Sequence, residues 1–144
     1  MLLLARKRLL NKLAETAADA ELLAANLTRH KEMCTYPTLR AGLRELAAAE
    51  TAQANAMREL LLHNGVSPKL PGQPPHEGSS NWERLRNDLA IQVKILRALH
   101  AQIPQWTGVD PQICEQLRET AKNEDRYIDQ LRDLTLKCDP QALD

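Results

Sequence analysis

Several residues that could carry chemistry lie on helix faces that otherwise hold apolar side chains. Glu50 and Gln53 fall in the middle of a leucine-rich stripe, and Glu124 falls at the centre of another, with Tyr127 beside it. Carboxylates in an apolar interior are costly unless they are paired, hydrogen-bonded, protonated or bound to metal. The pattern therefore predicts a polar site in the core of a helical protein.

The remaining two predicted helices also carry polar residues near their apolar faces. Gln92 is central on the face of the third helix, with Asp88 to one side. Glu21 flanks the alanine-rich stripe of the first helix, whereas Glu15 falls on its polar side. Each of the four helices thus offers at least one candidate.

The predicted hairpins place these residues at matching heights. Residues equidistant from a turn lie side by side in an antiparallel hairpin, so we expect Glu21 beside Glu50 and Gln92 beside Glu124. Both second helices repeat one spacing, Glu50-x-x-Gln53 and Glu124-x-x-Tyr127, which puts two polar groups on one face.

The elements that must position these residues are four long helices in one domain, residues 1–144. The chain is rich in Ala and Leu, has no Phe and has few aromatic residues, a composition that favours helices over sheets. We predict helices over about 3–33, 37–63, 80–103 and 111–137. Their ends are marked by Pro37, by Asn64-Gly65, by a capping box from Ser80 to Glu83, by Pro104 and by Asp110-Pro111.

The connections predict an all-α four-helix bundle of two antiparallel hairpins joined by a long crossover. Only a few residues separate the helices within each hairpin, whereas residues 65–79 form a proline-rich link between the hairpins. Fifteen extended residues reach about 50 Å, more than the length of about 37 Å expected for a helix of 25 residues. The link can therefore cross the bundle and make the third helix parallel to the second. A loop between adjacent ends is the alternative.

In architecture and core glutamates, the chain resembles the ferritin-like superfamily, which includes ferritins, bacterioferritins and rubrerythrins. There, each hairpin supplies a Glu from its first helix and a Glu-x-x-His from its second to a di-iron or di-manganese centre. The resemblance implies that Glu50 and Glu124 match the motif glutamates. Glu21 or Glu15 would be the ligand from the first helix, and Asp88 or Gln92 the ligand from the third.

The sequence departs from that pattern at both histidine positions, which hold Gln53 and Tyr127. One hypothesis is therefore a bundle without a functional di-iron centre, in which Gln53 and Gln92 belong to a polar core network. It would act as an oligomeric binding or structural protein, with a protein partner or a small ligand.

The alternative is a metalloprotein that binds iron or manganese through Glu21, Glu50, Asp88, Glu124 and Tyr127, with oxidase or metal-storage activity. A third reading is an unrelated bundle whose buried polar residues set its register. Whether the protein is an enzyme stays open.

Charge and apolar patterning set the expectations about partners and compartment. Lys+Arg and Asp+Glu balance at 19 each, which disfavours nucleic acid as a partner, and no segment has the length of a membrane span. Three widely spaced cysteines favour free thiols and a cytoplasmic protein. A second apolar strip on the first helix predicts a homodimer through that helix, with the residues Leu3, Leu4, Leu22 and Met33.

Overall fold

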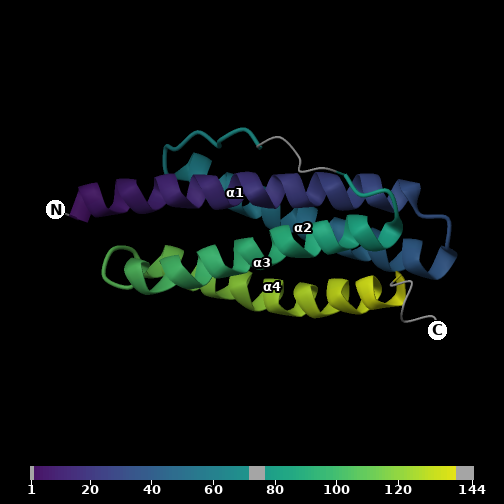
Figure 1. The fold of residues 1–144 in the computed structure, drawn as a ribbon. Helices are drawn as coiled ribbons and strands as arrows, with labels where there is room; N and C mark the ends of the chain where they lie inside the picture. The colour runs from purple at the N-terminus through teal and green to yellow at the C-terminus, as the bar shows by residue number, and fades with distance from the viewer. Residues whose placement is uncertain (1, 72–76, 139–144) are drawn as a thin grey trace.

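The computed structural model describes residues 2–71 and 77–138, and four helices account for most of that part of the chain. They are α1 (Leu2–Met33), α2 (Pro37–His63), α3 (Asn81–Trp106) and α4 (Pro111–Cys138). The helices lie side by side along one axis (Figure 1). The predicted all-α four-helix bundle is confirmed. Within the described residues, none of the helices combines the length and apolar character that a membrane span requires.

Each helix packs against two neighbours, which defines the corners of the bundle. The hairpin partners α1 and α2 contact each other, as do α3 and α4. Between the hairpins, α1 packs on α3 and α2 packs on α4. Helices α2 and α3 therefore lie at opposite corners, although they follow each other in the chain.

The described parts of the long crossover lie beside α1, toward opposite ends of the bundle (Figure 1). Near its start, the Lys69 ammonium group lies 3.2 Å from the carboxylate of Glu15, in the first half of α1. Near its end, Glu77 accepts a hydrogen bond of 2.6 Å from Arg29, in the last turns of α1. Helix α3 therefore begins beside the end of α1 and runs parallel to α2, which confirms the predicted topology. Of the predicted domain and its crossover, Met1, residues 72–76 with His76, and residues 139–144 lie outside the described residues.

Local hydrogen bonds explain why the helices begin and end where they do. The Ser80 hydroxyl accepts from the Glu83 backbone N–H at 3.2 Å, while the Glu83 carboxylate accepts from the Ser79 N–H at 3.0 Å. The Asp110 carboxylate caps α4 in the same way, through the backbone N–H groups of Gln112 and Ile113. Gly65 ends α2 at a φ of 75°, a left-handed conformation that suits glycine.

Helix α3 ends at Trp106, one turn beyond the expected end at Ile103. Pro104 lies inside the helix and removes one backbone hydrogen bond. The indole of Trp106 is completely buried in the core. Burial of an aromatic ring stabilises a protein more than a single hydrogen bond does. The packing of Trp106 therefore keeps the chain helical beyond Pro104.

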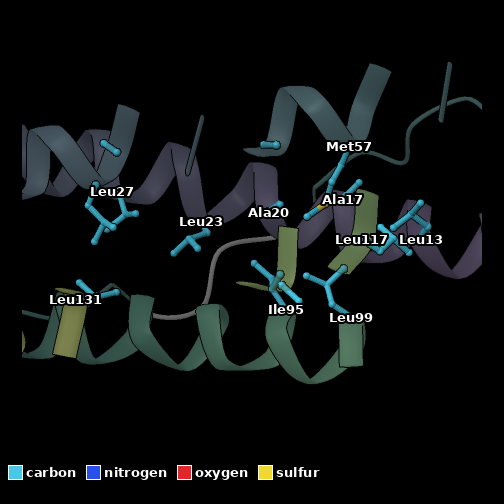
Figure 2. Packing of buried hydrophobic residues seen from close by; sticks show 14 of the residues in the cluster. Leu13, Ala17, Ala20, Leu23, Leu27, Met57, Ile95, Leu99, Leu117 and Leu131 are labelled. Carbon is cyan, nitrogen blue, oxygen red and sulfur yellow. The ribbon is translucent and has the colours of Figure 1, made fainter. Parts of the chain in front are cut away.

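The core is built mainly from leucine and alanine. Figure 2 shows Leu13, Ala17, Ala20, Leu23 and Leu27 in sequence along α1, facing apolar residues of the other helices. Alanines on this face let neighbouring helices approach closely, and the leucines fill the space between layers. The interior is therefore mainly apolar, and its buried polar residues are exceptions.

Candidate functional site

Two carboxyl groups meet in the bundle interior. Glu50 comes from the middle of α2 and is 2% exposed, and Glu124 comes from the middle of α4 and is 1% exposed. The two groups are close enough for Glu124 to raise the proton affinity of Glu50. The helix faces therefore place both glutamates inward, as the apolar stripes predicted.

Amide side chains from α2 and α3 surround this pair. Gln53 donates a hydrogen bond of 3.0 Å to Glu124 and also lies 3.2 Å from the backbone carbonyl of Thr120. Asn123 donates to the Gln53 carbonyl at 3.3 Å, which fixes the orientation of the amide. Gln92, with no exposed surface, lies beside Glu50. Gln53 is therefore hydrogen-bonded to the pair, and Gln92 lies next to it.

Burial makes protonation of the pair favourable. Loss of hydration and, to a lesser extent, the neighbouring Glu124 together raise the pKa of the Glu50 carboxyl to about 10. Burial also raises the pKa of Glu124, but hydrogen bonds from Glu50 and Gln53 oppose this shift. Because like charges at close range disfavour double ionisation, Glu50, with its strongly raised pKa, holds its proton near neutral pH.

The pair still has unused hydrogen-bonding capacity. Glu50 Oε1, Glu124 Oε2 and both polar atoms of the Gln92 amide are buried without a geometrically satisfactory partner among the described residues. Buried polar atoms are normally hydrogen-bonded to protein or to ordered water. These atoms therefore remain available as hydrogen-bond partners or ligands.

Asp88 lies in a second polar cluster, together with His30 of α1. The Asp88 side chain has no exposed surface and pairs with Nδ1 of His30, which is 4% exposed. On the other side of the ring, His30 Nε2 lies 3.0 Å from Glu77, whose carboxylate also binds Arg29. Burial raises the pKa of Asp88, while the hydrogen bond and charge of His30 oppose the rise. The cluster ties α3 and the end of the crossover to α1.

The structure does not bring Glu21 or Glu15 to the carboxylate pair. The Glu21 side chain is 16% exposed and binds the Arg58 guanidinium on the outer side of α1 and α2, instead of lying beside Glu50. Glu15 is exposed and pairs with Lys69. A carboxylate at the flank of a helix keeps its hydration and gains a cation, which costs less than burial. The buried residues of α1 include no carboxylate.

Tyr127 is half-buried next to the core cluster. The guanidinium of Arg126 lies over its ring, 5.4 Å from the centre. No hydrogen bond links the phenol to either glutamate within residues 2–71 and 77–138. The phenol of Tyr127 is therefore not hydrogen-bonded to the carboxylate pair.

Few metal ligands surround the carboxylate pair among the described residues. The described residues contain no group of three or more His, Cys, Asp or Glu side chains arranged to hold a metal ion. At the core pair, the neighbours of the two glutamates are amides, which are weak ligands compared with the imidazoles and carboxylates of di-metal sites. Asp88, which could add a carboxylate, is engaged with His30.

Solved structures show which fold this arrangement belongs to. A ferritin-like, di-iron-carboxylate protein from Bacillus anthracis strain Ames superposes with a TM-score of 0.81, at 14% identity over 91% of this chain and 97% of the other. The fold is ferritin-like. BfrA from M. tuberculosis superposes on this ferritin-like bundle with a TM-score of 0.79, at 19% identity over 93% and 94% of the two chains. No protein-family model and no curated protein matches the sequence.

The main residue that sequence reasoning missed in this ferritin-like bundle is His30. It lies near the end of α1, where it is buried and paired with Asp88. One signal was present: the position follows Leu23 and Leu27 on the apolar stripe of α1. Its partners lie 58 and 47 residues away in the chain, so helical periodicity alone could not identify them.

Proposed function

We propose that this protein is a ferritin-like bundle without a functional di-iron centre, which acts as an oligomeric binding or structural protein. The observation that supports the proposal is the set of side chains around Glu50 and Glu124, where the amides of Gln53 and Gln92 lie in place of metal ligands. A protonated Glu50 beside Glu124, with Gln53 donating to the latter, satisfies part of the hydrogen-bonding capacity of the pair without metal.

The missing contribution of α1 supports this proposal. A di-iron centre of this fold uses a carboxylate from each of the four helices. Here α2 and α4 supply Glu50 and Glu124, α3 supplies the neutral Gln92, and the buried part of α1 supplies no carboxylate. Two metal ions would have one carboxylate each, too few to balance their charge.

Metal loading tests the proposal directly. After incubation with excess Fe(II) or Mn(II) under anaerobic conditions and removal of free ions, we expect less than about 0.1 equivalent of metal per chain, measured by elemental analysis. A ferritin-like protein with an intact di-iron centre serves as the positive control. Binding of about two equivalents that is abolished in an E50Q/E124Q variant would overturn the proposal.

A second candidate is a protein that holds one iron or manganese ion between Glu50 and Glu124. The unpartnered oxygens Glu50 Oε1 and Glu124 Oε2 favour it, because hard oxygen donors suit these metals. Binding would require loss of the Glu50 proton and would therefore strengthen as pH rises. About one equivalent of metal at pH 8.5, with much less at pH 6, would support this candidate over the first.

The compartment and the assembly form part of the same proposal. Cys34, Cys114 and Cys138 are free thiols, which suits the reducing cytoplasm. On α1, Leu3 and Leu4 are strongly exposed and Met33 is partly exposed, which leaves apolar surface for a second copy of the chain. We therefore propose a cytoplasmic homodimer formed through α1.

A further inference from the structure

A groove between α2 and α4 lies outside the carboxylate pair and has features of a ligand site. Its volume is about 830 Å³, within the range of small-molecule sites. Met57 and Leu117 are buried beneath it, and Leu60 is half-buried along it, so its floor is apolar. Such an apolar floor suits an aliphatic chain.

The charges along the groove have one sign. Glu59 of α2 and Glu119 of α4 both line it, and no lysine or arginine is among the described residues that do. Neither carboxylate forms an ion pair within the described part of the chain, whereas Glu115, one turn away on α4, lies 3.5 Å from Arg118. His63 is the one lining residue that could carry a positive charge. The groove therefore presents uncompensated negative charge beside apolar surface.

Gln53 lines the groove and also contacts the carboxylate pair. It is held by hydrogen bonds to Thr120 O, Glu124 and Asn123, at 3.2, 3.0 and 3.3 Å. These contacts use both donors and the acceptor of the amide. The groove is thus separated from the glutamate pair by a fixed side chain, and its binding properties do not depend on whether the pair holds a metal.

We propose that this groove binds an aliphatic ammonium compound. Its alkyl chain lies on Met57, Leu60 and Leu117, and its cationic head reaches the carboxylates of Glu59 and Glu119. The apolar floor selects against small inorganic cations, which hold their hydration shells, and the two carboxylates select against neutral alcohols and anions. The inference concerns a surface site distinct from the core site of the proposed function.

Titration with hexylammonium chloride, followed by NMR of the backbone amides, tests this assignment. We expect saturable shifts at groove residues such as Leu60 and Thr120, with a dissociation constant on the order of 1 mM for a ligand of this size. Hexanol and ammonium chloride should each bind at least about fivefold more weakly. No saturable shift below about 50 mM, or equal affinity for hexanol, would overturn the proposal.

A matched pair of variants locates the binding site. In E59Q/E119Q we expect about fivefold weaker binding of hexylammonium, the scale of two exposed ion pairs. E45Q/D125N changes the net charge equally, at exposed positions of the same two helices outside the groove, and should bind like the wild type. Equal affinity in E59Q/E119Q and the wild type would contradict the proposal, as would equal weakening in both variants.

Discussion

Two buried carboxyl groups in this bundle avoid an uncompensated charge in different ways. Glu50 lies among uncharged groups and beside another glutamate, and its raised pKa keeps it neutral. Asp88 is more completely buried but has His30 as a hydrogen-bonded partner, which opposes the effect of burial on its pKa. The contribution of Glu50 to stability therefore depends on its protonation, whereas that of Asp88 depends on its partner His30.

The substitution E50Q should flatten the pH dependence of stability. The native Glu50 carboxyl keeps its proton up to a pKa of about 10, while the unfolded chain releases it near 4.5. Unfolding between these values releases a proton, so this contribution is fully present below the unfolded pKa and is lost as pH rises toward the folded pKa. The loss is at most about 1.4 kcal/mol per pH unit. Urea unfolding at pH 6, 7 and 8 should show a steeper decline for the wild type than for E50Q.

The exposed Glu45, on the same helix, provides the control for this measurement. E45Q should follow the wild-type pH dependence, because its carboxyl is solvated in both states. If E50Q and the wild type have parallel profiles over this range, Glu50 is not held in its protonated form.

The substitution H30A should destabilise the protein by about 3 kcal/mol. It removes the hydrogen-bonded partner of the Asp88 carboxyl group, which lies in a site with no exposed surface. The free energy of unfolding from urea titration measures this loss. H100A, at an exposed position of α3, should change it by less than about 0.5 kcal/mol.

A double-mutant cycle separates the pair from simple loss of packing. H30A/D88A removes the buried charge together with its partner, so it should be less destabilising than the sum of the two single substitutions. Strict additivity would show that His30 and Asp88 do not act as a pair.

Residue-scale prediction from the sequence succeeded where a helix face determines the environment. The stripe positions of Glu50, Gln53, Gln92 and Glu124 predict burial, and all four are buried. It failed for Glu21, because whether a flanking side chain turns inward depends on the cation available outside, here Arg58. Contacts between helices that are far apart in the sequence, such as that of His30 with Asp88, leave no local signal in the sequence.

At the scale of the helices, local signals determine most boundaries. The capping box at Ser80 and Glu83 and the cap at Asp110 are recognisable from residue types and spacing, and both form in the structure. Pro104 is an exception, since burial of Trp106 outweighs the lost hydrogen bond and extends α3. The position of Pro104 alone therefore does not determine where α3 ends.

The substitution S80A should cost about 1 kcal/mol in the free energy of unfolding. It removes the hydroxyl that accepts from the Glu83 N–H at the start of α3 and leaves that donor without its cap. Thermal unfolding by circular dichroism measures the change. S67A, at an exposed position early in the crossover, is the matched control and should be neutral. Equal melting temperatures for the two variants would show that the capping bond adds nothing.

At the scale of the whole molecule, the length of the crossover determines the topology. Because the crossover ends beside the last turns of α1, α3 starts at the opposite end of the bundle from the end of α2, and α2 packs against α4 instead of α3. That arrangement places the middle of α2 beside the middle of α4, where Glu50 and Glu124 meet. An up-down bundle with a short second loop would make α2 and α3 neighbours and would change the environment of both glutamates.

The assembly is the last property that the bundle surface predicts. Leu3 and Leu4 are 81% and 74% exposed on α1, Met33 is 43% exposed, and Leu22 is half-buried between them. Exposed leucines on one helix are stabilised when a second copy covers them. At micromolar concentration, light scattering should give twice the 16.2 kDa mass of one chain. The variant L3E/L4E should shift this mass toward that of one chain, whereas L70E/L136E, which alters equally exposed leucines on the crossover and α4, should not. A strict monomer in the wild type would show that the strip on α1 does not bind a second copy.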